Sequence, residues 1–458
     1  MKEDRGQSPS VFFSSLADVH ARLIVSVMIA GMDASRFATH SLRDPHLLRI
    51  LAAALDAVEP AQAVRRSLPA MSGSIYGLGI GKAAIPMLTA LAEAYPLSGA
   101  LAICKHASPL HRSLFPVLVG GHPIPNLDSL RAGEAALQFV SALGEDDTLV
   151  CLISGGGSAL MTAPYIPLED LQTLTSLLLA CGARIDEINT LRRQLDRVKG
   201  GGLARATKAK VVSLILSDVI GSPLEAIASG PTCPNPTTNE DALGILDKYF
   251  SGLSMEPLRH REVLNSVTQW LRVSKPTETA GYDFSRVQNV IVGDNRLASQ
   301  AAVEQARREG FEAEVLTNEL QGEAREVGVR LASLLKDERS KRRRPFCLIA
   351  GGETTVTVRG NGKGGRNQEL ALAAAVELRG VENVMLIALA TDGEDGPTDA
   401  AGAAATGETC QRGERLGLDA ADYLSRNDAY RYFEALGDLI RSGPTGTNVN
   451  DLVFLIGQ

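Results

Sequence analysis

The chain has 458 residues, which is too many for one average hydrophobic core and enough for two domains of ordinary size. Its 53 acidic and 46 basic residues give a formal net charge of −7, which argues against a protein that binds nucleic acid through a broad basic face. Six cysteines stand far apart, without a CxxC pair or metal-ligand spacing, so we expect buried thiols and a reducing, cytoplasmic location. No apolar stretch approaches the ~20 residues that span a bilayer, so we expect a soluble protein without a membrane partner.

The N-terminal segment is predicted to be irregular. Its apolar stretches, residues 11–13 and 23–29, are short and have basic residues between them, so they only weakly resemble a signal peptide. We therefore expect a poorly ordered extension over residues 1–32. The first regular signal is an apolar repeat at helical spacing from Leu47 to Val64, which predicts an amphipathic helix that ends near Pro60.

Two series of short apolar runs follow, and both are typical of buried strands in α/β domains. The first series has predicted helices at residues 130–143 and 168–181, and its strands cover residues 74–78, 99–105, 115–119, 148–154 and 210–217. The second series covers residues 287–292, 313–317, 346–350, 354–358, 385–391 and 451–456. Residues 233–247 and 273–284, with prolines and polar neighbours, are predicted connectors.

These patterns predict an α/β protein with two Rossmann-like, doubly wound domains, at residues 33–280 and 285–458. Two domains imply a cleft between them. Because open α/β sheets bind ligands beyond the carboxyl ends of their strands, we expect an interdomain active-site cleft.

Glycines cluster around isolated cations, which suits a phosphorylated ligand because glycine lets backbone N–H groups approach an anion closely. In residues 77–83 (GLGIGKA), Gly79 and Gly81 precede Lys82 between a predicted strand and a predicted helix. The segment resembles a phosphate loop but is not a Walker A motif, because Tyr76 and Ala83 stand where that motif has Gly and Ser or Thr. A tight turn with Lys82 in solvent is the alternative.

A second glycine-rich loop, residues 154–160 (SGGGSAL), closes a later strand. Ser154 and Ser158 flank three successive glycines, which favours an anion pressed against the backbone at Gly155, Gly156 and Gly157. A plain connection is the alternative, and a serine nucleophile ranks third because GxSxG is absent.

Further charged residues follow in the first half. Three arginines between residues 192 and 197 precede Lys199, which is followed by three glycines and is a candidate phosphate ligand. These cations stand at the end of a predicted helix, where the helix dipole favours them in any case. Asp218 follows the strand at residues 211–216, at the edge where α/β proteins bind ligands, and is a candidate base or magnesium ligand.

The second half contains three comparable motifs. Glu353 follows one predicted strand, Arg366 and Asn367 open a helix after a glycine-rich stretch, and Asp392 follows another strand. A single Asp before Gly more often caps a turn, but three such motifs together favour a binding site.

Taken together, these motifs resemble the glycerate 2-kinases of the MOFRL type, a family with two α/β domains and an active site in the cleft between them. Asp294 and Asp196 depart from the resemblance, because Ser is more usual at both positions. The matching segments run in order, cover nearly everything beyond about residue 45, and are residues 79–82, 154–160, 199–201, 217–232, 293–298, 351–356, 362–369, 390–403 and 443–451.

The resemblance implies an activity and cofactors. Lys82 and Arg366 match the family's prominent active-site cations, which implies transfer of the ATP γ-phosphoryl group to D-glycerate, normally at the 2-hydroxyl, to give 2-phosphoglycerate. We expect Lys82 to contact the phosphoryl group or the glycerate carboxylate, and Arg366 to clamp from the other domain. Asp218 and Asp392 are the expected Mg²⁺ ligands, although Asp218 could instead accept the hydroxyl proton.

Glu353, Asn295 and Asn367 are weaker candidates for holding glycerate or ribose. Two other functions stay open at this point. One is an NAD(P)H-dependent hydroxypyruvate reductase, although Lys82 occupies the last position of the GxGxxG fingerprint. The other is a non-catalytic nucleotide-binding regulator. The expected partners are small molecules, and the expected state is a monomer or homodimer.

Overall fold

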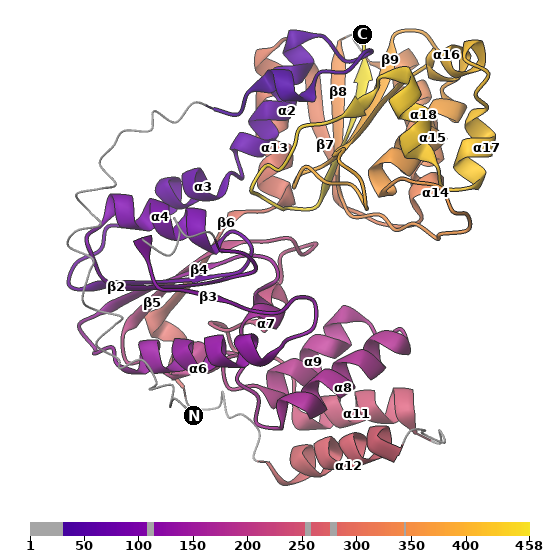
Figure 1. Ribbon diagram of the computed structural model, residues 1–458. Coiled ribbons are helices and arrows are strands. Elements are labelled where there is room, and N and C mark those ends of the chain that lie inside the picture. The colour runs from indigo at the N-terminus through magenta and orange to yellow at the C-terminus, as the bar shows by residue number, and fades with distance from the viewer. Residues whose placement is uncertain (1–30, 108–113, 252–257, 275–281, 343–344) are drawn as a thin grey trace, which may run out of the picture. The chain divides into compact units, whose positions relative to one another are not determined.

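The computed structural model describes residues 31–107, 114–251, 258–274, 282–342 and 345–458 (Figure 1). Nearly all of the predicted N-terminal extension, residues 1–32, therefore lies outside the described residues. The described chain divides into two compact units. Unit 1 comprises residues 64–216 and 222–292, and unit 2 comprises residues 31–63, 217–221 and 293–458.

Unit 1 contains a six-stranded sheet in the order β3-β2-β1-β4-β5-β6, the strand order of doubly wound nucleotide-binding folds. The pairs β3–β2, β2–β1, β1–β4 and β4–β5 are parallel. The bounds are β1 Ile75–Ile80, β2 Leu97–Cys104, β3 Val117–Val119, β4 Thr148–Ile153, β5 Lys210–Leu216 and β6 Val287–Gly293. The first five strands confirm the predicted series.

Helices α4 (Ala84–Ala94) and α6 (Leu127–Ser141) cover opposite faces of this sheet (Figure 1). Short helices lie in the loops, namely α7 Gly157–Leu160, α10 Gly202–Arg205 and the 3₁₀ helices η3 Ile227–Ser229 and η4 Phe284–Arg286. A helical subdomain with its own apolar core is added to the unit and consists of α8 Leu168–Ala180, α9 Ile185–Leu195, α11 Asn239–Phe250 and α12 Leu258–Val273.

The predicted connector at residues 233–247 is wrong over most of its length, because α11 begins at Asn239. A capping box starts this helix: the Thr238 hydroxyl accepts the Asp241 N–H, and the Asp241 carboxylate accepts the Thr238 N–H. Part of the second predicted connector, residues 275–281, lies outside the described residues.

Unit 2 contains a six-stranded sheet in the order β11-β10-β9-β12-β8-β7. Only the β7–β8 pair is parallel; the β8–β12, β12–β9, β9–β10 and β10–β11 pairs are antiparallel. The strands are β7 Glu312–Leu320, β8 Phe346–Gly352, β9 Val384–Ala390, β10 Gly402–Thr406, β11 Leu439–Ile440 and β12 Asp451–Gly457. The α/β class and the two-domain organisation are confirmed, whereas this second sheet has mixed strand directions.

The helices of unit 2 cover both faces of its sheet. Figure 1 shows α2 and α13 on one side and α14 and α15 on the other. The bounds are η2 Ala34–Phe37, α2 Pro45–Asp56, α13 Asn295–Arg308, α14 Ala324–Lys341, α15 Arg366–Glu377, α16 Thr409–Arg415, α17 Ala420–Ser425 and α18 Ala429–Leu436, and α3 Pro60–Ser67 crosses the boundary between the units.

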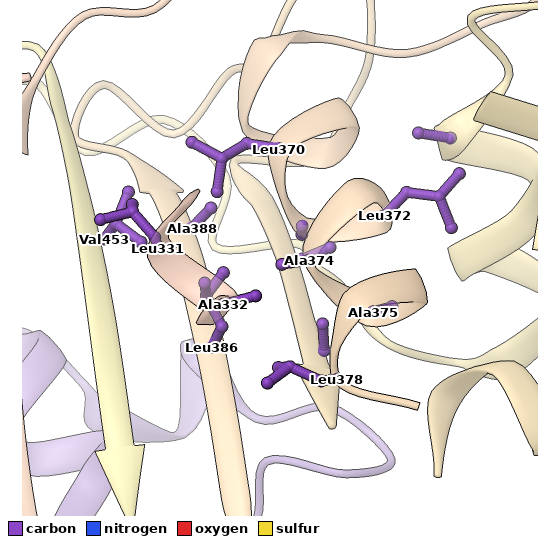
Figure 2. Close-up of a cluster of buried hydrophobic side chains, with 14 of the residues drawn as sticks. Leu331, Ala332, Leu370, Leu372, Ala374, Ala375, Leu378, Leu386, Ala388 and Val453 are labelled. Atoms are coloured by element: carbon purple, nitrogen blue, oxygen red, sulfur yellow. The ribbon is translucent and has the colours of Figure 1, made fainter. Parts of the chain in front are cut away.

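The core of unit 2 lies between its sheet and helices α14 and α15 (Figure 2). Leu331 on α14 and Leu370 on α15 meet Leu386 and Ala388 of β9 and Val453 of β12. Alternate residues of β9 face this core, as expected for a strand packed between two layers. The apolar core fixes α15 against the sheet, and α15 begins at Arg366.

Three features differ from the sequence-based expectations. Strand β6 belongs to the first sheet, and residues 33–63 belong to unit 2, so the grouping differs from the predicted boundaries 33–280 and 285–458. The predicted helix at residues 47–64 is two helices, because α2 ends at Asp56 and Pro60 starts α3. Residues 354–358 form no strand beyond one bridge at Thr355.

Candidate active site

The carboxyl ends of β1 and β4 form the switch point of the first sheet. β1 and β4 are neighbours, but the chain reaches β4 only after building β2 and β3 on the other side of β1. Such a reversal leaves a crevice that open α/β folds use for ligands. Lys82 follows β1 and the glycine loop 154–158 follows β4, so both predicted motifs lie at this crevice.

The two loops are joined by hydrogen bonds. The Lys82 N–H donates to the Gly155 carbonyl (2.9 Å), and the Ala83 N–H donates to Ser154 Oγ (3.0 Å). The Ser154 hydroxyl donates in turn to the Ile80 carbonyl (3.2 Å). Ser154 is therefore buried between the loops and holds them together, whereas its predicted role was to bind the ligand.

The glycines near Lys82 make room for different neighbours: Gly79 for the backbone of α4, and Gly81 for the backbone of Ser154. Gly79 lies inside β1, and a Cβ atom there would stand 2.8 Å from the Ala84 carbonyl oxygen, so glycine allows α4 to approach the strand. Gly81 has φ +114°, and a Cβ there would stand 2.3 Å from the Ser154 carbonyl oxygen. The structure thus gives Gly79 a packing role instead of the predicted phosphate contact.

Lys82 and His122 lie beside Gly156, the central residue of the second loop. Gly156 has φ +83°, and a Cβ there would stand 3.4 Å from His122 Nε2 and 3.6 Å from Lys82 Cγ. Burial, together with the charges of Lys82, Lys105 and Arg192, holds the pKa of His122 below its usual range. Sequence reasoning missed His122, which follows β3 in a Gly-Gly-His-Pro segment.

Arg192, on α9, contacts Ser158 of the same loop. Its Nη1 donates to Ser158 Oγ (3.4 Å) and to Asn189 Oδ1 (3.5 Å). Ser158 and Ser229 share a hydrogen bond (Oγ–Oγ 2.7 Å), and the Ser229 hydroxyl donates to Asn189 Oδ1 (3.0 Å). Burial lowers the pKa of Arg192. Throughout the described ranges, no carboxylate lies within ion-pair distance of Lys82 or Arg192.

The predicted phosphate ligand Lys199 has a different environment. Its side chain is buried, and Nζ donates to Asp196 Oδ2 (2.5 Å) and to the Met161 carbonyl (3.1 Å). Asp196 also accepts from the Thr162 hydroxyl and from the Ala163 N–H. The unusual Asp196 is thus the counter-ion of Lys199, and the pair supports the fold behind the glycine loop.

In unit 2, Arg366 is held by two carboxylates. Nε and Nη2 donate to Asp451 (2.6 and 3.1 Å), and Nη1 donates to Glu353 (2.6 Å). Burial disfavours the charged guanidinium, but the hydrogen bonds and the charges of Asp451 and Glu353 outweigh this and raise the pKa of Arg366. Asp451 at the start of β12 was not among the predicted site residues.

Asp395 caps α15 from outside the helix. Its carboxylate accepts the N–H groups of Asn367 (3.1 Å) and Gln368 (2.8 Å), and a Cβ on Gly365 would collide with it. Burial and the nearby charge of Asp451 raise the pKa of Asp395 to about 7, against the opposing effect of these N–H groups. The predicted ligand Asn367 is therefore buried in a structural polar cluster.

The remaining predicted residues lie at the same end of unit 2 or in its short crossing segment. Asn295 is buried, and its Nδ2 donates to the carbonyls of Val449 (3.0 Å) and Asp451 (2.9 Å). Asp392 accepts the Glu394 N–H (3.1 Å) and so makes a turn, as the alternative for that residue predicted. Asp218 is half-buried in residues 217–221.

No group of three or more acidic, histidine or cysteine side chains in the described ranges could hold a metal ion by itself. No helix in those ranges is both long and apolar enough to cross a bilayer.

Comparisons with known proteins follow the division of the sequence. Residues 46–264 match the model described as "Domain of unknown function (DUF4147)", and residues 346–451 match the MOFRL family. The D-glycerate 2-kinase of Thermotoga maritima is 40% identical over 90% of this chain and 99% of its own. A crystal structure of glycerate kinase from Thermotoga maritima has a TM-score of 0.81 and 40% identity and covers 90% of this chain and 98% of that chain. A putative hydroxypyruvate reductase of Agrobacterium vitis is 39% identical over 90% of this chain and 94% of its own.

Proposed function

The chain belongs to the glycerate 2-kinase family, and we propose that it transfers the γ-phosphoryl group of ATP to the 2-hydroxyl of D-glycerate, giving 2-phosphoglycerate. Like those relatives, it is then a phosphotransferase that acts on an alcohol group. The observation that carries the proposal is the switch point of unit 1, where Lys82 and Arg192 flank a glycine loop without a carboxylate partner in the described ranges.

This arrangement suits phosphoryl transfer because that reaction requires mainly alignment and neutralisation of the charge spread over the transferring oxygens. The glycines at residues 155–157 let an anion approach the backbone without a Cβ in the way. Lys82 is exposed and mobile on its four-carbon stem, so its ammonium group can move with the transferring phosphoryl group and neutralise its charge. Arg366 in unit 2, oriented by Asp451 and Glu353, stays a predicted catalytic cation.

ATP and Mg²⁺ are part of the proposal. Asp218 and Asp392 are half-buried carboxylates in loops after strands, and Mg²⁺ typically takes only one or two protein carboxylates together with phosphate oxygens and water. When bound, the ion would neutralise phosphate charge. Asp218 remains the alternative acceptor of the hydroxyl proton. The free cysteines fit the cytoplasmic location, and a monomer or homodimer remains our expectation.

The test is product analysis. After incubation with Mg-ATP and D-glycerate, phosphorus NMR should show ADP and the phosphomonoester signal of 2-phosphoglycerate. A product phosphorylated at the 3-hydroxyl would contradict the assigned position, and absence of any phosphoglycerate would contradict the kinase.

A reductase is the second candidate, because the first sheet has the strand order of dinucleotide-binding domains. Oxidation of NADH by hydroxypyruvate, followed by absorbance, tests it directly. We expect no such turnover. Binding of ATP without turnover of either substrate would instead indicate the regulator.

A further inference from the structure

We propose that Arg192, oriented by Ser158, Ser229 and Asn189, binds the carboxylate of the acceptor and thereby makes the enzyme specific for small 2-hydroxycarboxylates. The inference rests on the proposed function and adds to it the group that recognises the acceptor. It assigns the carboxylate to Arg192 and leaves the phosphoryl group to Lys82, a choice that sequence alone did not make.

The first step is the charge of Arg192. A partly buried guanidinium needs an anionic or strongly polar partner, because desolvation of a charge is costly. In the described ranges it donates only to two neutral oxygens, at 3.4 and 3.5 Å, which is the outer limit of a hydrogen bond. Arg193 next to it shows the contrast, since its guanidinium donates to Asn235, Thr190 and the Glu225 carbonyl at 3.0 to 3.1 Å. Arg192 is therefore the under-satisfied cation of the two.

The second step is how Arg192 is oriented. The Ser229 hydroxyl donates to Asn189, so the hydrogen bond between the two serines uses the Ser158 proton. Arg192 donates to both Ser158 and Asn189, which closes a ring of four side chains. The ring consists of neutral groups and the guanidinium, and it orients Nη1 of the cation without neutralising its charge.

The third step is the rigidity of the backbone at Ala228 and Ser229, which carries one side chain of the ring. Ala228 and Ser229 have φ +50° and +58°, a conformation that costs free energy for residues other than glycine. A Cβ on Gly157 would stand 2.9 Å from Ala228 Cβ, so the two loops are in close contact. Strained backbone held by close packing presents Ser229 in one position.

The fourth step separates carboxylate from phosphate. The acceptor carboxylate stays in place during the reaction, which suits a fixed, planar guanidinium that can donate two parallel hydrogen bonds. The phosphoryl group moves from one oxygen to another, which suits the exposed and flexible Lys82 beside Gly156. The oriented guanidinium of Arg192 thus suits the carboxylate, which stays in place, and the flexible ammonium group of Lys82 suits the phosphoryl group, which moves.

The experiment compares D-glycerate with its neutral amide, D-glyceramide, as acceptors for the wild-type enzyme and Arg192→Gln. We expect Arg192→Gln to lower kcat/KM for glycerate by ~10²-fold, mainly through KM, as for loss of a charge-assisted hydrogen bond. The value for glyceramide should change less than ~3-fold, and KM for ATP should stay the same. Arg197→Gln is the matched control, because Arg197 is exposed and 3.8 Å from Glu134.

An equal loss of kcat/KM for both acceptors would place Arg192 on the phosphoryl group and overturn the proposal. An unchanged kcat/KM for glycerate in Arg192→Gln would also overturn it. Ser158→Ala keeps the charge and loosens its orientation, so it should lower the preference for glycerate by ~10-fold. If Arg192→Gln does not fold, this variant decides the question. If the wild type phosphorylates neither acceptor, the proposed function fails, but calorimetry with D-glycerate alone still tests the carboxylate site. Binding that is present in the wild type and Arg197→Gln and lost in Arg192→Gln supports the site. No binding to the wild type overturns it.

Discussion

Lys82 and Lys199 stand in similar glycine-rich motifs, yet the structure gives them opposite environments. Lys82 is exposed at the switch point, whereas Lys199 is buried against Asp196. Asp196, three residues before Lys199, is the local difference between the two motifs, but the burial of Lys199 also depends on Thr162 and Met161, which come from a different loop. The catalytic assignment of Lys82 stays a prediction, and the phosphate-binding role predicted for Lys199 is better replaced by a structural role.

Replacing Lys82 by Ala should lower kcat/KM for glycerate by at least ~10²-fold, the scale for losing one donor to developing charge. The melting temperature should stay within ~1 °C, since exposed side chains away from strained or buried features change stability little. Lys210→Ala is the control, because Lys210 is exposed at the amino end of β5. Full turnover of Lys82→Ala would refute its role.

Helix α15 shows how an element can depend on a residue far along the chain. Its first N–H groups are satisfied by Asp395, because Gly365 at the N-cap has no side chain. In the folded state the pKa of Asp395 is raised to about 7, above its usual value near 3.9. Between these values the native protein binds more protons than the unfolded chain, so this carboxyl group makes stability fall as pH rises.

The variant Asp395→Asn keeps an acceptor oxygen and removes the titration. The free energy of unfolding of the wild type minus that of the variant should therefore decrease from pH 5 to pH 8, by on the order of 2 to 3 kcal/mol. Urea unfolding followed by circular dichroism at both pH values measures it. A difference that does not change with pH would mean that Asp395 is already ionised at pH 5.

Most strands of both sheets could be predicted from apolar runs bounded by glycine, but the sheet to which each belongs could not. β6 has the same pattern as β7, yet it joins the first sheet. β10, with the sequence GAAAT, lacks the β-branched residues that mark a strand and was missed. At the site, Lys82 and residues 155–158 were found through their glycines. Ser229 lies in the matching segment 217–232 but was given no role there, and Asn189 carries no local signal.

At the scale of the whole molecule, each unit has its own apolar core, and one spectroscopic probe lies in unit 1 alone. The chain has one tryptophan, Trp270, which stacks on Tyr165 in unit 1 with ring centroids 5.3 Å apart. Tryptophan fluorescence therefore reports on unit 1 alone, while circular dichroism reports on both units. Comparison of the fluorescence and circular dichroism unfolding curves therefore separates the stability of unit 1 from that of unit 2.

Lys199→Met leaves Asp196 buried without its counter-ion, which should destabilise unit 1 by ~3 to 5 kcal/mol. In urea, the fluorescence midpoint should fall by ~1 to 2 M, given the slope for a unit of this size. Part of the circular dichroism change should remain at the wild-type midpoint. Lys210→Met is the control, and an equal shift of the whole dichroism curve would show that both cores unfold together.

The strand β12 lies between β8 and β9 in the second sheet, and the apolar face of α2, from Leu47 to Leu55, belongs to the same unit. More than half of the polypeptide, including all of unit 1, is translated between these two elements. During synthesis, the apolar face of α2 therefore stays without its packing partner α13 until residues 295–308 are made, and the gap between β8 and β9 is filled only once β12 is made. A chain that terminates before residue 451 lacks β12 and leaves β8 and β9 without the strand between them, so the second sheet forms only from a chain that includes this strand.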